Sequence, residues 1–176
     1  PELEVERAQK IYDSLKAAKN KITPRPEDVA FLVRAAVGVK TDPSKDEQTR
    51  KKTLLELEEM ARDLSTTIHV QAQKKEDKNL YLEAAAAYER YLSLFRPKQY
   101  ATQMMQNRAD ALFAARQFPQ AARQFEELAT YLDASDLKLQ SDKRADAKDK
   151  AEDASKLDVA KDRKIMSEEE KAKAAA

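Results

Sequence analysis

The sequence of 176 residues lacks cysteine and tryptophan and contains one glycine and one histidine. Because there is no cysteine, disulfide bonds and thiolate chemistry are excluded, and the chain is compatible with either the cytosol or a bacterial periplasm. A single glycine cannot build a glycine-rich phosphate loop. With so few turn formers, strands joined by tight turns are not expected, and the composition predicts an all-α protein.

The sequence also lacks an excess of charge of either sign and a long apolar run. Its 33 basic and 32 acidic residues nearly cancel, so no overall field attracts nucleic acid or an acidic membrane. No apolar run approaches the roughly 18 residues that span a bilayer, so we expect no direct membrane insertion. The chain opens at Pro1 without a methionine, which is compatible with a mature or trimmed chain whose targeting segment has been removed.

One short pattern is present twice, in residues 81–91 and 118–128. Each copy has an aromatic residue, a small residue three later, an aromatic four after that and a large apolar residue three further on. The copies are Tyr81, Ala84, Tyr88 and Tyr91, and Phe118, Ala121, Phe125 and Leu128. Positions spaced three, four and three apart share one face of a helix. Both segments are therefore predicted to be helices that pack closely on a neighbour at the alanine.

A matching first helix precedes each of these segments. Residues 101–116 carry Ala109 and Leu112 on one face, and Ala109 lies twelve residues before Ala121, as Ala72 lies twelve before Ala84. The pattern resembles the tetratricopeptide repeat, a helix pair repeated at roughly 34 residues. The resemblance is clearest in 101–132 and fair in 65–96, where Gln71 and Lys75 replace the large apolar residues usual in the family. It implies a right-handed superhelix of antiparallel helix pairs.

Outside these repeats, the pattern divides 1–132 into further helices of the same repeat domain. A helix over 2–20 shows the same spacing at Val5, Ala8, Tyr12 and Leu15. A second is predicted to begin at Pro26 and to end before Gly38, which would be a left-handed residue just past the helix. A third is predicted from Asp42-Pro43, with Leu54, Leu57, Ala61, Leu64 and Ile68 on its buried face. It either turns near residues 64–67 or continues to about Asp77, and Asn79 is the candidate N-cap of the next helix.

Residues 133–176 differ in composition from the rest. They alternate charges with alanines and have few large side chains, which favours helix through opposite charges four residues apart. We expect a charged capping helix over 135–155, which an open solenoid end needs for solubility, followed by a solvated helix or tail.

The sequence offers no constellation for catalysis, for a cofactor or for a metal. The lone histidine, His69, has no further histidine, cysteine or paired carboxylate at ligand spacing, so a structural or surface role is expected. Glu58-Glu59 and Glu126-Glu127 are adjacent on their helices and diverge, so they do not form acid–base pairs. We therefore expect a protein that is not an enzyme.

The positive functional hypothesis is a binding groove. First helices of stacked repeats line a concave surface that takes up an extended peptide or a helix of another protein. The candidate groove residues are Gln103, Gln106, Asn107, Arg108 and Asp110. An ordinary polar helix face is the alternative interpretation of these residues.

Two other functions stay open. The helix around 54–68 or the charged C-terminal helix can pair with its own copy in a homo-oligomer. The other is nucleic-acid binding by two basic clusters, which are Lys45, Arg50, Lys51 and Lys52, and Lys143, Arg144, Lys148 and Lys150. Both clusters are interleaved with acids and lack aromatic residues for base stacking, so we expect no nucleic-acid partner.

A narrower resemblance concerns the compartment. The segments AAAAYERYLSLF and RADALFAARQF are similar to repeats of bacterial envelope proteins, such as outer-membrane assembly lipoproteins and tetratricopeptide lipoproteins of gliding-motility machinery. This resemblance implies a periplasmic or outer-membrane-associated adaptor within an envelope complex.

Overall fold

The computed structural model describes residues 2–18, 21–96, 99–134 and 147–156, and this part of the chain is helical without a strand. The helices are α1 (Glu2–Ala17), α2 (Pro26–Thr41), α3 (Glu47–Lys75), α4 (Lys78–Phe95), α5 (Ala101–Ala114) and α6 (Phe118–Ala134). A further helix covers 147–156. The all-α class predicted from the composition is confirmed.

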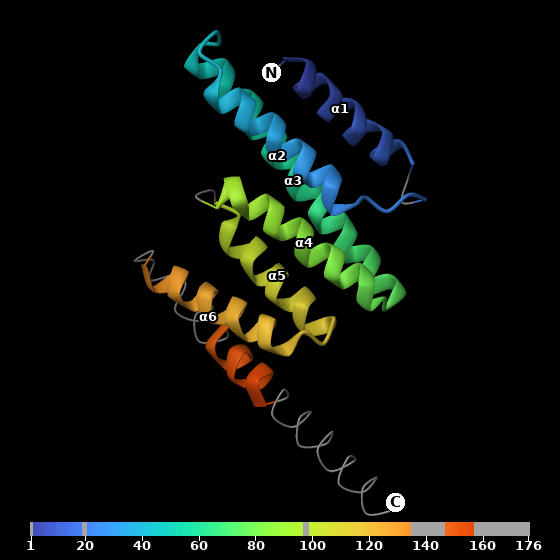
Figure 1. The fold of residues 1–176 in the computed structure, drawn as a ribbon, viewed down its shortest axis with the longest axis vertical. Helices are drawn as coiled ribbons and strands as arrows, with labels where there is room; N and C mark the ends of the chain where they lie inside the picture. Colours follow the sequence, from blue (N-terminus) through green and yellow to red (C-terminus); the bar gives the residue numbers. More distant parts are fainter. Residues whose placement is uncertain (1, 19–20, 97–98, 135–146, 157–176) are drawn as a thin grey trace, which may run out of the picture.

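The helices stack in the order in which they occur in the sequence. Each of α1 to α6 packs mainly on its sequence neighbours, with additional contacts between α2 and α4 and between α1 and α3. Figure 1 shows them following one another along the longest axis, from α1 at one end to helix 147–156 at the other. The buried apolar residues form one continuous cluster from Ala8 to Ala154. The core is therefore continuous along the stack and lies between successive helices.

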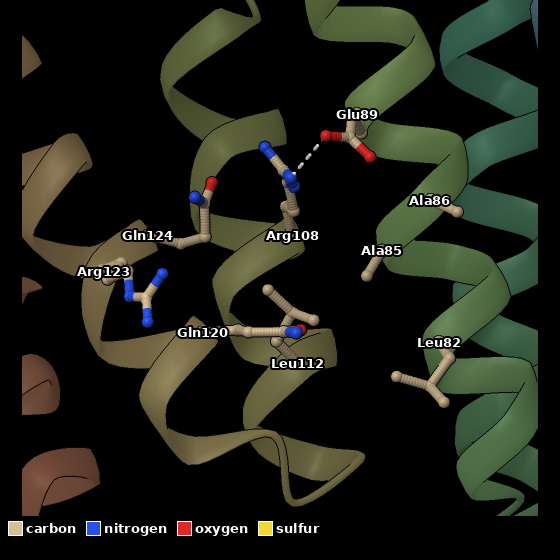
Figure 2. A pocket seen from close by; sticks show the side chains of 9 residues that line it. All are labelled: Leu82, Ala85, Ala86, Glu89, Arg108, Leu112, Gln120, Arg123 and Gln124. Carbon is tan, nitrogen blue, oxygen red and sulfur yellow. Dashed lines mark hydrogen bonds and ion pairs between the residues drawn. The ribbon is translucent and has the colours of Figure 1, made fainter.

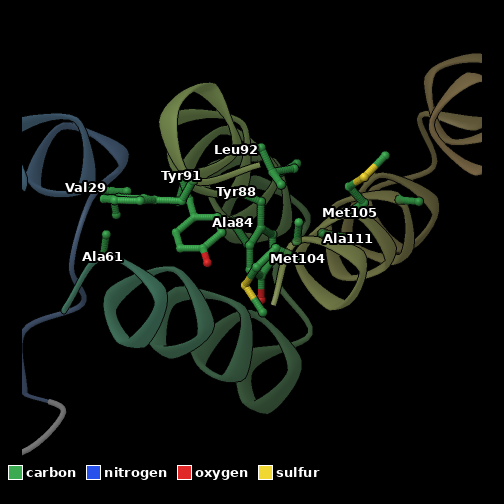
Figure 3. Close-up of a cluster of buried hydrophobic side chains, with 14 of the residues drawn as sticks. Val29, Ala61, Ala84, Tyr88, Tyr91, Leu92, Met104, Met105 and Ala111 are labelled. Carbon is green, nitrogen blue, oxygen red and sulfur yellow. The ribbon is translucent and has the colours of Figure 1, made fainter. Parts of the chain in front are cut away.

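The two copies of the repeated pattern, in α4 and α6, are buried at the same positions. Ala84 and Ala121 are fully buried, Tyr88 corresponds to the buried Phe125, and Tyr91 to the buried Leu128. The first aromatic residue of each copy, Tyr81 or Phe118, is half-buried. Tyr88 and Tyr91 project from α4 toward α3 (Figure 3). On α5, Ala109 and Leu112 are also buried.

The turns that join α3 to α4 and α5 to α6 use the same backbone motif. Glu76 and Arg116 have positive φ angles of 50° and 61°. The amide that follows each of them bonds back to the last turn of the helix, Asp77 N to Ala72 O at 3.2 Å and Gln117 N to Leu112 O at 2.9 Å. This is the Schellman arrangement, which satisfies carbonyls that a helix end leaves unpaired.

The position of the turn differs between the two hairpins. Glu76 lies four residues after Ala72 and eight before Ala84, whereas Arg116 lies seven after Ala109 and five before Ala121. The three-residue difference is close to one helical turn of about 3.6 residues. The α3–α4 hairpin thus reverses about one turn earlier relative to its small residues.

The predicted end of α2 is wrong. Gly38 lies inside α2 and does not have a positive φ angle. The helix continues to Thr41, since the next residue, Val39, is fully buried in the core. It stops at Asp42, whose ψ of 111° is extended, because the proline that follows disfavours a helical conformation in the residue before it.

The predicted start of α3 at Asp42-Pro43 is also wrong. The N-cap is Asp46, whose carboxylate accepts a hydrogen bond from Thr49 N at 2.9 Å. The Asp42 carboxylate instead accepts from the backbone N and the hydroxyl of Ser44, at 2.9 and 2.6 Å. A short turn with its own aspartate therefore separates α2 from α3.

Helix α3 is continuous, which settles the alternative left open near residues 64–67. The Ser65 hydroxyl donates to Ala61 O at 2.8 Å and the Thr66 hydroxyl donates to Arg62 O at 3.0 Å. Because both hydroxyls bond to the preceding turn of their own helix, neither caps a new one. At the next junction, the N-cap of α4 is Asp77 and not Asn79.

The described part of the predicted C-terminal capping segment is helix 147–156. Its alanines Ala147, Ala151 and Ala154 are buried in the common core. Lys150 Nζ lies 5.7 Å from the centroid of the Phe125 ring of α6 and 3.4 Å from Asp110 Oδ1 of α5. This helix therefore packs next to α5 and α6, and the predictions for 135–146 and 157–176 lie outside the described residues.

Candidate partner-binding clefts

Two clefts lie between the stacked helices. The first, which we call the α3–α5 groove, has a volume of about 330 Å³. It is lined by Thr66, His69, Val70 and Gln73 of α3, by Tyr81 and Tyr88 of α4, and by Asn107, Asp110 and Ala114 of α5. The second, which we call the α4–α6 cleft, has a volume of about 380 Å³. It is lined by Leu82, Ala85, Ala86 and Glu89 of α4, by Arg108 and Leu112 of α5, and by Gln120, Arg123 and Gln124 of α6.

The floor of the α3–α5 groove contains the only histidine of the sequence. His69 is 8% exposed, and its Nδ1 lies 3.1 Å from the hydroxyl oxygen of Tyr88. Its ring also packs edge-on against Tyr81 and Tyr88, with centroids 5.8 and 5.7 Å apart. Burial lowers the pKa of His69, and the nearby charge of Asp110 opposes that shift. A neutral imidazole that is held by a tyrosine hydroxyl supports the floor of the groove.

The rim of this groove combines apolar and charged groups. Val70 is 43% exposed. Asp110, whose side chain is 38% exposed, pairs with Lys150 of helix 147–156 at 3.4 Å. The groove therefore offers an exposed apolar contact next to groups that can hydrogen-bond to a peptide.

The α4–α6 cleft carries two arginines and two glutamines. Figure 2 shows these side chains from α5 and α6 facing the residues of α4 across the cleft. Arg108 Nη2 donates to Glu89 Oε1 at 2.9 Å. Leu82, Ala85 and Leu112 provide apolar surface in the same cleft.

The structure does not bring the five predicted groove residues onto one surface. Asn107 and Asp110 line the α3–α5 groove, whereas Arg108 lines the α4–α6 cleft. Gln103 is exposed and Gln106 half-buried, and neither lines either cleft. Consecutive residues of a helix differ in direction by about 100°, so Arg108 faces away from its neighbour Asn107.

Sequence reasoning missed the contribution of α3 to this groove, although the repeat contains the signal. The two copies of the pattern lie 37 residues apart, as Ala84 and Ala121 show, and the same offset relates Val70 to Asn107 and Gln73 to Asp110. All four residues line the α3–α5 groove. Positions 37 residues apart on α3 and α5 thus line the same cleft.

A buried carboxylate lies outside both clefts. Glu58 of α3 is 2% exposed, and its Oε1 accepts from the Tyr91 hydroxyl at 2.5 Å and from Arg62 Nε at 3.1 Å. The Arg62 guanidinium in turn lies 3.9 Å from the centroid of the Tyr100 ring. The neighbouring Glu59 is exposed. The two glutamates therefore have separate surroundings, and Glu58 joins α3 to α4.

Two of the four residues in the first basic cluster form ion pairs with acidic residues of the chain. Lys45 contacts Glu2 at 2.8 Å and Lys51 contacts Glu47 at 2.6 Å. In the second cluster, Lys150 contacts Asp110, while Lys143 and Arg144 lie outside the described residues. Within the described part of the chain, no group of three or more histidine, cysteine or acidic residues is placed to hold a metal ion.

No family model, curated protein or solved structure matches this chain. None of the helices in the described ranges is both long and apolar enough to cross a membrane. The described residues form an all-α stack of helices, and the α3–α5 groove and the α4–α6 cleft lie between these helices.

Proposed function

We propose that this chain is a non-catalytic scaffold of tetratricopeptide-like repeats that binds a segment of another protein in the α3–α5 groove. The observation that carries the proposal is the equivalence of the groove positions on α3 and α5. Val70 and Gln73 on one helix and Asn107 and Asp110 on the next line the same cleft at the repeat offset.

The packing of the helix pairs supports the repeat assignment. Both small residues of the pattern, Ala84 and Ala121, are fully buried, and both hairpins reverse through a residue of positive φ. Helices that contact mainly their sequence neighbours are typical of repeat proteins, in which each pair needs the next to cover its apolar face. We assign the stack to the right-handed superhelix that the resemblance implies, with helix 147–156 as its cap.

The chemistry of the groove favours a peptide or a helix as the ligand. A peptide backbone requires donors and acceptors, which Asn107 and Asp110 provide. Val70 offers an apolar contact for one side chain of the partner. The compartment proposed for this adaptor is the bacterial envelope, on the sequence resemblance alone.

Site-specific photocrosslinking in cells of the native host tests this function. A photoreactive amino acid at Val70, which is 43% exposed and lines the groove, should give an adduct of discrete mass with one protein. The matched control is the same amino acid at Leu55, which is 64% exposed and lines neither cleft. Equal adducts at both positions, or none at Val70, would contradict the proposal.

A further inference from the structure

The α4–α6 cleft contains donors that the described part of the chain does not satisfy. Arg108 is held by its bond to Glu89, and its side chain is 21% exposed. Its Nε is buried and has no hydrogen-bond partner among the described residues. A buried donor without a partner costs about 1–3 kcal/mol. The ion pair with Glu89 thus orients this guanidinium, and its Nε makes no hydrogen bond to a described residue.

Further donors line the same cleft from α6. The side chains of Arg123, Gln120 and Gln124 form no hydrogen bond or ion pair with another described residue. Figure 2 shows the Gln124 side chain next to Arg108, the Arg123 guanidinium lower in the view, and Gln120 one helical turn before Gln124. Two guanidinium groups and one carboxylate, that of Glu89, leave the cleft with an excess of one positive charge.

The side chains that line the α4–α6 cleft favour a carboxylate as the ligand. Guanidinium and amide donors fit the two oxygens of a planar carboxylate, and arginine prefers such paired geometry. Glu89 competes weakly for Arg108, since its side chain is 57% exposed and exposed ion pairs contribute about 0–1 kcal/mol. The apolar surface of Leu82, Ala85 and Leu112 adjoins these donors and suits a short hydrocarbon stem.

We infer that the α4–α6 cleft is a second binding site, which takes a carboxylate carried on a short apolar stem. The carboxylate comes either from an acidic side chain of a partner protein or from a free small organic acid. The two clefts have no lining residue in common. Failure of ligand binding in one cleft therefore leaves the proposal for the other cleft unaffected.

The experiment is an NMR titration that observes the arginine Nε–Hε resonances of the full chain. The probes are butyrate, 1-butanol, the blocked tripeptide acetyl-Ala-Glu-Ala-amide and inorganic phosphate. We expect butyrate or the tripeptide to shift Arg108 and Arg123 saturably, and 1-butanol to shift neither. Stronger binding of the tripeptide assigns the site to a partner's acidic side chain, and stronger binding of butyrate assigns it to a free acid.

Two variants and one control complete the test. Arg108→Gln and Arg123→Gln should each weaken the carboxylate probe by about tenfold, the loss expected when one charge-assisted bond is removed. Arg123 is exposed, so its variant should fold normally. The control Arg90→Gln removes the same charge from an exposed position of α4 outside the cleft and should leave binding unchanged. Absence of any shift with either carboxylate probe, or tighter binding of phosphate to the same residues, would overturn the inference.

Discussion

Glu58 and His69 are polar side chains that α3 buries against α4, and each contacts a tyrosine hydroxyl. Glu58 accepts from Tyr91 at 2.5 Å, and His69 lies 3.1 Å from Tyr88. Burial raises the pKa of both tyrosines, and the contact with Glu58 raises that of Tyr91 further, so both hydroxyls stay protonated. These contacts fix how α4 is aligned along α3, because a shifted helix leaves polar groups buried without partners.

Replacement of Tyr91 by phenylalanine tests the first contact. Removing the hydroxyl leaves the buried Glu58 carboxylate with fewer donors, so the variant should lose about 1.5–3 kcal/mol in the free energy of unfolding. Urea denaturation measures the loss. In the control Tyr131→Phe, the hydroxyl lost is an exposed donor to Arg96 O, and the change should stay within about 0.5 kcal/mol. Equal losses in the free energy of unfolding for the two variants would contradict a stabilising role of the Tyr91–Glu58 hydrogen bond.

The second contact predicts a dependence of stability on pH. Burial lowers the pKa of His69 from its ordinary value of 6.5, so the unfolded chain binds a proton more readily than the folded chain. Stability should therefore be greatest above pH 6.5 and should fall as the pH decreases toward the folded pKa. Urea denaturation on both sides of this window should show the loss in the parent and a smaller loss in His69→Gln. If the parent and His69→Gln lose the same stability as the pH decreases, His69 is not the cause of the pH dependence.

At the scale of the element, α4 and α6 carry the two copies of the repeated pattern, and the alanine of each copy is fully buried. Replacement of Ala84 or Ala121 by phenylalanine should destabilise the protein by roughly 1–3 kcal/mol or more, because neither site has room for a ring. The same replacement at Ala114, which is exposed on α5, is the control and should have little effect. Thermal and urea unfolding distinguish these outcomes, and parent-like stability of the Ala84 variant would refute the close approach.

The start of α4 provides a prediction about capping. The Asp77 side chain accepts from the backbone N of Asn79 and of Leu80, at 2.8 and 3.3 Å. Asp77→Ala should therefore cost about 0.5–2 kcal/mol of stability. Asn79→Ala is the matched control and should be nearly neutral, since Asn79 is an exposed residue in the first turn of the helix. The opposite ranking in urea denaturation would restore Asn79 as the cap.

The helical class and the buried faces of α4 and α6 could be predicted from the sequence because side chains spaced three, four and three apart repeat there. The ends of the helices were less predictable. Gly38 and Asp42-Pro43 carry the local signals of a helix end and a helix start, yet burial of Val39 extends α2 and Asp46 caps α3. The α3–α5 groove was found only in part, because its α3 side depends on which helices lie next to each other in space.

At the scale of the whole molecule, the helices form a stack in which each one covers the apolar face of its neighbour. Residues of α3 and α5 line one cleft together with α4, and residues of α4 and α6 line the other together with α5. The first pair makes the proposed partner groove and the second makes the proposed carboxylate site.

The most direct test of the proposed scaffold role is a binding titration of the partner captured through Val70. Affinity for that partner should be measured for the parent, for Val70→Glu in the α3–α5 groove and for Leu55→Glu, which lies outside both clefts. Both positions are exposed, at 43% and 64%, so neither change disturbs the core. We predict that Val70→Glu weakens binding by about tenfold or more, a change of about 1.4 kcal/mol, while Leu55→Glu binds like the parent. Parent-like affinity of Val70→Glu, or an equal loss in both variants, would contradict a partner site in the α3–α5 groove.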